Sequence, residues 1–497
     1  MSVGSAFAKH GAMQKSGSQL TNEPAADPAG QTSAWRLSDP ELLEQWGRRF
    51  PYYSQQLFRL FRQHIPSGSS VLEIGCQLGD LLASLEPSHG VAIDARPKVV
   101  EAARQRHPHL TFIQADPAEF DLGGQTFDYI IVSTVLGDIK DLQGLFNSIR
   151  KACRSDTRVI IAYQNAAWEP ILKFATRLGV RRPTGEQNWL SVLDFTNLLY
   201  LADLEVIRKS GEVLFPISVP GVSAFFNRFL VRFWPWAHLG LIQLLIARPI
   251  GPPPLLASPR VSVVVPTRNE RGNIEGILAR TPEMSAGTEI VFVDGNSTDG
   301  TADEISRQIA ARPDRNVKLI LQGDGVGKGD AVRKGFTAAT GDILMILDAD
   351  LTVPPEILPR FVEAVRQGKG EFVNGTRLVY PMEEQAMRFL NKIGNRFFSI
   401  LFTWLLNQPI RDTLCGTKVL SKAHYEVIAR NRYYFGDFDP FGDFDLILGA
   451  AKANLRFVEI PVRYESRKYG VTNISRFRHG WLLLKMSWVA FRRLKLR

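Results

Sequence analysis

The chain alternates short apolar runs with amphipathic helical stretches in two separate regions. In the first region, helical periodicity over residues 35–64 is followed by apolar runs at 71–74, 91–93, 110–113, 129–132 and 159–162. In the second region the apolar runs lie at 261–265, 290–293, 318–321 and 343–347. Strands that alternate with helices are typical of parallel sheets covered by helices. The pattern therefore predicts two α/β domains.

The segments outside these regions set the expected domain boundaries. Residues 1–34 are Ser, Gly, Ala, Gln and Pro with almost no large apolar side chain, so we expect them to be disordered. Residues 250–259 hold four prolines and read as a stiff linker. This division gives a first domain at 35–249 and a second at 260–497, which agrees with the two or three domains expected for 497 residues.

Composition narrows the class of protein. With 45% hydrophobic residues, 22% charged residues, 40 Gly and 29 Pro, the chain is not collagen-like, coiled-coil or wholly disordered. Its three cysteines, Cys76, Cys153 and Cys415, fit neither a disulfide framework nor a tetrahedral zinc site. We therefore expect a reducing cytosol, and the absence of a basic and apolar leader argues against a cleaved secretory signal.

The net charge of +10 is concentrated at the C-terminus. Residues 466–497 contain nine Lys or Arg and no Asp or Glu, and aromatic residues interleave with these cations. This mixture fits an anionic membrane surface better than nucleic acid, for which no reading motif is present. The alternative is a solvated basic face.

Two amphipathic stretches favour a protein that lies on the membrane without crossing it. The longest uncharged apolar stretches, 213–227 and 233–247, have 15 residues each, fewer than the roughly 18 to 20 of a spanning helix. Residues 388–408 predict an interfacial helix roughly 30 Å long, or alternatively a core helix. Near 479–497, a second helix separates cations (Arg478, Lys485, Arg492) from an apolar face (Trp481, Leu484, Trp488, Phe491). We expect peripheral association with the cytosolic face of the membrane.

Candidate chemistry in the first domain begins where the first strand meets a glycine turn, in Val-Leu-Glu-Ile-Gly-Cys-Gln-Leu-Gly at 71–79. A parallel sheet binds nucleoside ligands at such turns, because glycine lets the backbone approach the ligand. Asp94 ends the next strand and could accept both ribose hydroxyls, and Asp116 ends the third strand, where it could face an adenine amino group.

This ordered set resembles the class I S-adenosylmethionine-dependent methyltransferases. The resemblance implies a Rossmann-like sheet in which Glu73, Gly75 and Gly79 line the methionine end of the cofactor, Asp94 the ribose, Asp116 the adenine and Ser133 the acceptor pocket. The family usually has Gly where this chain has Gln77, which opens the alternative of a degenerate scaffold or sensor domain. Asn165, Trp168 and Glu169 follow the fifth strand as candidates for the methyl-acceptor site, or as a packed loop.

In the second domain, two strands end in polar groups suited to a nucleoside, in Pro-Thr-Arg-Asn-Glu at 266–270 and Val-Asp-Gly at 293–295. Gly-Val-Gly-Lys-Gly at 325–329 offers backbone amides and a lysine for phosphate. Asp348 and Asp350 flank one residue at a strand end, where they could hold one divalent cation together with a diphosphate. For this pair taken alone, a helix cap before Pro354 is the alternative.

Taken in order, these motifs resemble family 2 glycosyltransferases of the GT-A fold, nearest to members similar to dolichyl-phosphate-mannose synthase. The resemblance implies a UDP- or GDP-linked sugar donor and Mg²⁺ or Mn²⁺ at Asp348 and Asp350. It also implies a set of donor-binding residues: Pro266, Thr267, Asn269, Glu270 and Asp294 at the nucleoside, with Lys328 and Asp330 at the inner side of the nucleotide.

The acceptor region of that family corresponds here to residues 412–418 and 441–445. Asp443 or Asp445 could take a proton from an acceptor hydroxyl, whereas a polyprenyl phosphate is already an anion and needs no base. The segment at 464–474 resembles one found in lipid-directed members, and it implies an acceptor or phosphate site at Arg467, Tyr469, Gly470 and Thr472.

The sequence thus predicts a metal-dependent glycosyltransferase with a lipid-linked or glycan acceptor, fused to an S-adenosylmethionine-dependent methyltransferase. The first alternative keeps the glycosyltransferase and makes the N-terminal half a non-catalytic scaffold or sensor. A nucleic-acid methyltransferase is disfavoured, because the basic tail belongs to the other domain. The identities of the sugar and of both acceptors, and the oligomeric state, do not follow from the sequence.

Overall fold

The structure is a computed structural model. It describes residues 39–133, 135–182, 187–251, 256–325, 327–377, 389–432, 444–465, 467, 469 and 476–496. The predicted disordered tail at 1–34 and part of the predicted linker lie outside the described residues.

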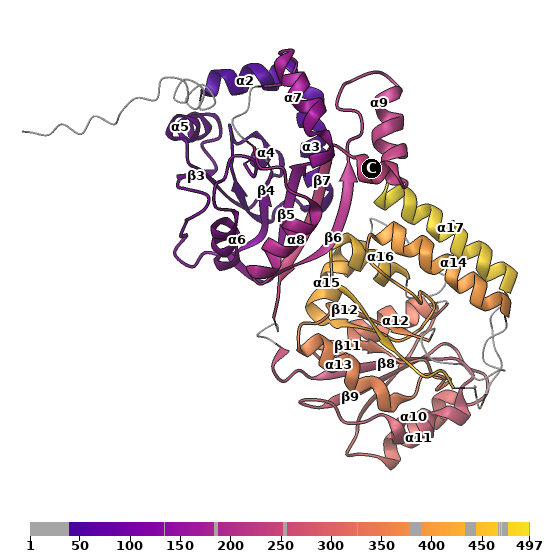
Figure 1. The fold of residues 1–497 in the computed structure, drawn as a ribbon. Coiled ribbons are helices and arrows are strands. Elements are labelled where there is room, and N and C mark those ends of the chain that lie inside the picture. The colour runs from indigo at the N-terminus through magenta and orange to yellow at the C-terminus, as the bar shows by residue number, and fades with distance from the viewer. Residues whose placement is uncertain are drawn as a thin grey trace, which may run out of the picture.

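A largely parallel sheet forms the centre of the N-terminal domain (Figure 1). In the described residues its strand order is β3-β2-β1-β4-β5-β7-β6, with β7 antiparallel to both of its neighbours. The strands are β1 (Ser70–Ile74), β2 (His89–Asp94), β3 (Thr111–Gln114), β4 (Phe127–Val132), β5 (Cys153–Gln164), β6 (Leu204–Glu212) and β7 (Ile242–Pro249). The inner strands are buried on both faces, which explains why they read as continuous apolar runs.

Helices cover this sheet. They are α2 (Pro40–Arg49), α3 (Pro51–His64), α4 (Asp80–Ser84), α5 (Pro97–Arg106), α6 (Leu142–Lys151), α7 (Glu169–Arg177) and α8 (Val192–Leu201). The helical pattern predicted over 35–64 contains two helices, because Pro51 cannot continue the first one and starts the second. Short turns follow β6: α9 (Val222–Ala224), η2 (Phe225–Phe229), η3 (Leu230–Arg232) and η4 (Trp236–Leu239).

The C-terminal domain has a second sheet, of order β10-β9-β8-β11-β13-β12-β14 in the described residues. Its strands are β8 (Val261–Thr267), β9 (Thr288–Asp294), β10 (Asn316–Leu321), β11 (Ile343–Ile346), β12 (Phe372–Thr376), β13 (Lys418–Ser421) and β14 (Phe457–Pro461). The strands β10, β9, β8 and β11 are parallel, and β13 is antiparallel to β11 and β12. Two sheets of this kind confirm the predicted α/β class.

The helices of the C-terminal domain are α10 (Ile274–Arg280), α11 (Thr301–Ala311), α12 (Gly327–Ala338), α13 (Leu358–Arg366), α14 (Phe389–Leu406), α15 (Lys422–Arg430), α16 (Phe444–Lys452) and α17 (Arg476–Leu494). Short turns lie at η1 (Ala166–Trp168) in the first domain and at η6 (Arg271–Asn273) and η7 (Pro355–Ile357) in the second. The two predicted interfacial helices correspond to α14 and α17, which pack side by side (Figure 1).

Both long helices are half buried. In α14, Phe402 and Leu405 lie in the core, whereas Phe397 and Ile400 are exposed. In α17, Phe491 was predicted on the free apolar face, but it is buried and stacks near Trp404 at 5.5 Å between ring centroids. In the part of the chain that is described, no helix is both long and apolar enough to cross a bilayer.

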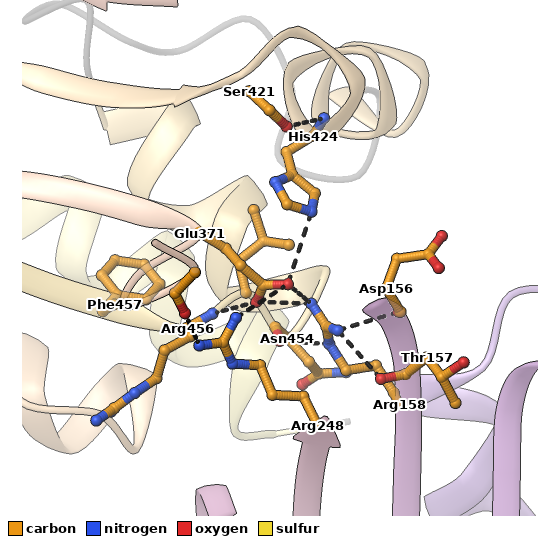
Figure 2. Close-up of polar contacts among 12 residues, drawn as sticks. Asp156, Thr157, Arg158, Arg248, Glu371, Ser421, His424, Asn454, Arg456 and Phe457 are labelled. Atoms are coloured by element: carbon orange, nitrogen blue, oxygen red, sulfur yellow. Dashed lines mark hydrogen bonds and ion pairs between the residues drawn. The ribbon is translucent and has the colours of Figure 1, made fainter. Parts of the chain in front are cut away.

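A buried ionic cluster joins the two domains (Figure 2). Arg158 of β5 donates from Nη2 to both carboxylate oxygens of Glu371, at 2.8 Å each, and from Nε to the Asn454 carbonyl at 2.9 Å. Arg248 of β7 lies 3.7 Å from the same carboxylate. Burial alone would raise the Glu371 pKa, but Arg158, His424 and Arg248 hold it at about 2. The first sheet is therefore tied to the residues that lead into β12 and β14 of the second.

Candidate functional sites

The carboxyl ends of β8 and β9 lie next to each other in the second sheet, because Thr267 pairs in register with Asp294. Asp294 is buried and accepts hydrogen bonds from the Ser297 amide at 3.0 Å and the Ser297 hydroxyl at 2.6 Å. Pro266 precedes Thr267 in the same strand. The predicted nucleoside residues of the two strands thus share one edge of the sheet.

The loop after β8 is tied to the loop after β9. Asn269 has a left-handed backbone, with φ of 58°, and accepts from the Thr298 amide at 2.8 Å. The Glu270 amide donates to the Thr301 hydroxyl at 3.0 Å, and burial raises the pKa of the Glu270 carboxyl. These hydrogen bonds hold the two loops together, so their polar side chains have fixed positions at this edge of the sheet.

Two cations neutralise the predicted metal carboxylates. Lys328 lies 2.6 Å from Asp348, and Arg467 lies 2.7 Å from Asp350 and 3.6 Å from Glu270. Burial would raise the Asp348 pKa, but Lys328 and the more distant Lys418 and Arg377 lower it overall. Asp348 is therefore ionised at neutral pH and can accept a cation.

The neighbourhood of Asp348 includes residues to which the sequence had assigned no individual role. A Cβ at Gly416 would lie 1.9 Å from an Asp348 oxygen, so glycine alone permits this approach. Lys418 is fully buried and Arg377 forms a buried pair with Asp412 at 2.7 Å. The motif at 412–418 was the available signal in the sequence, but it did not reveal that its glycine lies against the Asp348 carboxylate.

The remaining predicted residues of the second site are distributed as follows. Asp330 of α12 binds Lys334 at 3.0 Å and Gln322 at 3.0 Å, so it fixes the loop before its own helix. Asp445 is buried in α16, at 3.3 Å from Arg432 and 3.9 Å from Arg333. The ring of Tyr469 packs over Gly272. Asp443, Gly470 and Thr472 lie outside the described residues.

In the first domain, the glycine turn has the backbone that a nucleoside site needs. Gly75 and Gly79 have φ of 80° and 79°, and a Cβ at Gly75 would meet Val135 at 2.5 Å. Gln77 also adopts a left-handed backbone, with φ of 48°. This conformation strains a residue with a side chain and explains why glycine is the usual residue there.

Glu73 and Asp94 lie beside this turn. Glu73 is buried, one of its carboxylate oxygens has no hydrogen-bond partner in the described structure, and burial raises its pKa well above the usual range. Asp94 is also buried and is held by Arg96 through two bonds of 2.8 Å. Arg96 bonds to both oxygens of the Asp94 carboxylate, so a ribose would have to compete with it for Asp94.

The other predicted residues of the first site have mixed surroundings. Asp116 is exposed and closes a turn by accepting from the Ala118 amide at 2.8 Å. The Ser133 hydroxyl is buried and has no partner in the described structure. Asn165 and Trp168 donate to backbone carbonyls at 238–240, with the Trp168 bond at 2.7 Å. Of the two interpretations of that loop, packing is the one supported by these contacts.

The residues fit both implied ligands, but in each site a cation already pairs with the carboxylates: Arg96 with Asp94 in the first, and Lys328 and Arg467 with Asp348 and Asp350 in the second. The orphan Glu73 oxygen and the Gly75 cradle suit the amino acid end of S-adenosylmethionine, whereas the Arg96 pair opposes its ribose. Asp348 and Asp350 suit a divalent cation that shares a diphosphate, since oxygen ligands and retained waters are usual for Mg²⁺. Among the described residues, no group of three or more His, Cys, Asp or Glu is arranged to hold a metal without such help.

Comparison with known proteins gives a separate family match for each half of the chain. Residues 262–428 match the family model for glycosyl transferase family 2, and residues 46–209 match a model for a methyltransferase domain. The second half is similar to a dolichol-phosphate mannosyltransferase of Pyrococcus furiosus, with 30% identity over 237 residues, 46% of this chain and 64% of that protein. It is also 43% identical to an undecaprenyl-phosphate 4-deoxy-4-formamido-L-arabinose transferase of Edwardsiella ictaluri over 214 residues, 42% of this chain and 61% of that protein.

Similar solved structures include a putative methyltransferase from Haloferax volcanii in complex with its Trm112 activator, with 13% identity and a TM-score of 0.34. The match covers 45% of this chain and 99% of the solved one. The N-methyltransferase NodS from Bradyrhizobium japonicum gives 17% identity and a TM-score of 0.27, covering 44% and 92%.

The matches thus cover just under two thirds of the length of the two curated relatives named above. Both family models describe enzymes, and they match separate parts of the chain in the order in which the two sheets occur. A match to a methyltransferase domain in the first half is thus followed by a match to glycosyl transferase family 2 in the second half.

Proposed function

We propose that the C-terminal domain transfers a sugar from a UDP- or GDP-linked donor to a polyprenyl phosphate at the cytosolic face of a membrane. The observation that carries this proposal is the Asp348–Lys328 and Asp350–Arg467 arrangement beside the ends of β8 and β9. It gathers two carboxylates and two cations at the edge where a parallel sheet binds nucleotides. The relatives named above, whose names specify phosphorylated polyprenol substrates, support the acceptor class.

In this mechanism, Thr267, Asn269 and Asp294 hold the nucleoside. Lys328 and Arg467 lie where charge develops on the departing diphosphate, so their fixed positive charge lowers the barrier. A Mg²⁺ or Mn²⁺ ion held by Asp348 and Asp350 would add Lewis-acid stabilisation of the same charge.

The acceptor phosphate is a monoester with a second pKa of about 6, so it is already a nucleophilic anion near neutral pH. No general base is then required. Asp445, which is buried against Arg432 and Arg333, would position α16 rather than move a proton. With a glycan hydroxyl as acceptor, Asp443 or Asp445 would have to accept the proton.

Asp350→Asn tests the proposal, with Asp303→Asn as the matched control, since Asp303 is an exposed carboxylate on α11 of the same domain. We expect Asp350→Asn to lower sugar transfer to polyprenyl phosphate by about 100-fold or more, and Asp303→Asn to leave it unchanged. Equal activity of the two variants, or full wild-type activity in excess chelator, would contradict the metal assignment.

For the N-terminal domain we propose S-adenosylmethionine binding, with Glu73, Gly75 and Gly79 at the methionine, Asp94 at the ribose and Asp116 at the adenine. A second candidate role, a scaffold or sensor that binds no cofactor, is favoured by the Arg96 pair on Asp94 and by the strained Gln77. Calorimetry of the full chain with S-adenosylmethionine separates them. Absence of binding to both the wild type and Arg96→Ala would establish the scaffold.

Peripheral membrane association is part of the same proposal. On α17, Trp481, Leu484 and Trp488 are exposed on one face, and Lys485 and Arg492 lie in the same helix. Aromatic side chains enter the membrane interface while cations stay at the headgroups. This arrangement would bring the sugar-transfer site to a lipid-borne acceptor.

A further inference from the structure

A pocket of about 190 Å³ opens in the N-terminal domain between α3 and the turns α9 and η2. Its polar lining includes Tyr52, Gln56 and Arg59 from α3 and Ser218 and Arg228 from the segment after β6. No Asp or Glu lines it. The residues predicted for cofactor or sugar binding take no part in it, so the pocket is separate from both sites described above.

The pocket carries unbalanced positive charge. In the described parts of the chain, no ion pair joins Arg59 or Arg228 to a carboxylate. Burial lowers the pKa of Arg59, and the nearby cations Arg228 and Arg232 lower it further. Two guanidinium groups that share a cavity without a counter-charge repel each other, and a phosphate would satisfy both through charge-assisted hydrogen bonds.

Apolar side chains surround the pocket. Val219 and Val222 line it or border it, and Phe225 and Phe229 follow on η2, with exposed fractions between 39% and 52%. Trp234 is 79% exposed a few residues further on, and Trp236 and Leu239 are also exposed. Exposed large apolar residues gathered in one short segment are typical of an interaction surface. Here it flanks a cationic pocket, which matches an acyl chain next to a phosphate headgroup.

This surface continues into the other domain. The ring of Phe233 stacks on Trp404 of α14 at 5.4 Å, and the Trp404 indole donates to the Arg232 carbonyl at 2.8 Å. Figure 1 shows α9 beside the C-terminal end of α17, the helix that exposes Trp481 and Trp488. A bilayer could therefore contact both domains at once.

We infer that the methyltransferase domain binds the phosphate headgroup of an anionic phospholipid between Arg59 and Arg228, with the apolar segment 217–239 inserted into the membrane interface. The site orients the N-terminal domain on the same bilayer as α17. Lipid binding at this site does not depend on sugar transfer and is measured without a sugar donor. The proposal of the headgroup site and the proposal of sugar transfer can therefore fail independently.

Flotation of the full chain tests this site, with phosphatidylcholine vesicles that contain or lack phosphatidylglycerol. The pocket variant is Arg59→Gln with Arg228→Gln. The matched control is Lys98→Gln with Lys151→Gln, which removes the same charge from two exposed positions on α5 and α6 of the same domain. We expect the pocket variant to bind phosphatidylglycerol vesicles about tenfold or more weakly than the control does. Equal binding by the two variants would overturn the site.

Two further measurements distinguish folding defects and other ligands. Phe225→Ser alters a half-exposed side chain that packs on Phe226 and Phe229. It should weaken binding to phosphatidylglycerol vesicles while the circular dichroism spectrum stays that of the wild type. Inorganic phosphate is then added without vesicles, against chloride at equal ionic strength. If phosphate raises the thermal midpoint of the wild type but not of the pocket variant, and flotation is the same for both, the pocket takes free phosphate and the membrane assignment is wrong.

Discussion

Removal of the Arg158 guanidinium should loosen the junction between the two domains. Arg158 is buried, and its Nη2 lies 2.8 Å from both carboxylate oxygens of Glu371 (Figure 2). Arg158→Met keeps most of the side-chain volume but leaves Glu371 with the Arg456 amide at 2.8 Å and two more distant cations, Arg248 and His424, each at 3.7 Å. A buried carboxylate that loses its main cation destabilises the docked state.

The free energy lost in Arg158→Met can be worked out in two ways. Removal of one partner of a buried ion pair costs about 3 to 5 kcal/mol. The fall of the Glu371 pKa from 4.5 to about 2 corresponds to about 3 kcal/mol of net stabilisation of the charged carboxylate, after the cost of its burial is subtracted. Since Arg248 and His424 remain, we expect a loss of about 3 kcal/mol rather than 5.

Urea denaturation followed by tryptophan fluorescence, together with small-angle scattering, measures this loss. We expect Arg158→Met to lower the first urea midpoint and to increase the radius of gyration at low urea, because the domains separate before they unfold. The control is Arg154→Met on the same strand. Arg154 pairs with Asp128 and Asp156 at the surface, with a side chain 40% exposed, so its loss should cost no more than about 1 kcal/mol. Equal shifts for the two variants would refute the assignment of the junction to this cluster.

Three further predictions follow from the same structure. The folded pKa of Glu371 lies below its unfolded value of 4.5, so the stabilisation that its carboxylate provides is complete above pH 4.5 and is lost as the pH falls towards 2. Small-angle scattering should therefore detect domain separation of the wild type between pH 4.5 and 2, and little pH dependence for Glu371→Gln. Arg96→Ala should tighten S-adenosylmethionine binding about tenfold in calorimetry, because the ribose no longer competes with an ion pair for Asp94. Weaker binding by this variant would instead make Arg96 a ligand of the cofactor. Gly416→Ala should reduce sugar transfer about 100-fold, because its Cβ would displace the Asp348 carboxylate, whereas Gly394→Ala, where a Cβ meets nothing within 4 Å, should retain the wild-type rate.

The alternation of apolar runs and helical stretches predicted both α/β sheets, because inner parallel strands are buried on both faces and need nearly every residue to be apolar. The alternation pattern missed strands β6 and β7 of the first sheet and strands β12 to β14 of the second. In β6 this is understandable, since Arg208 and Lys209 interrupt the apolar pattern. A strand at the edge of a sheet, such as β6 or β14, needs apolar residues on fewer positions, so its local pattern is weaker. This reason does not apply to β7, β12 and β13, which are buried along nearly their whole length.

The motifs also identified which residues belong to each candidate site, since a strand end and a glycine turn determine where a polar side chain is presented. Only the tertiary structure paired those residues with their partners. Arg96 on Asp94 and Arg467 on Asp350 follow from side-chain geometry, and the contact between Gly416 and Asp348 joins segments far apart in sequence. The junction of Arg158 with Glu371 and the pocket between Arg59 and Arg228 likewise depend on side chains that are distant in the chain and meet only in the folded protein. Local sequence carries propensity and periodicity, whereas the electrostatics of a site is set by distances of a few ångströms that arise only when the chain is folded.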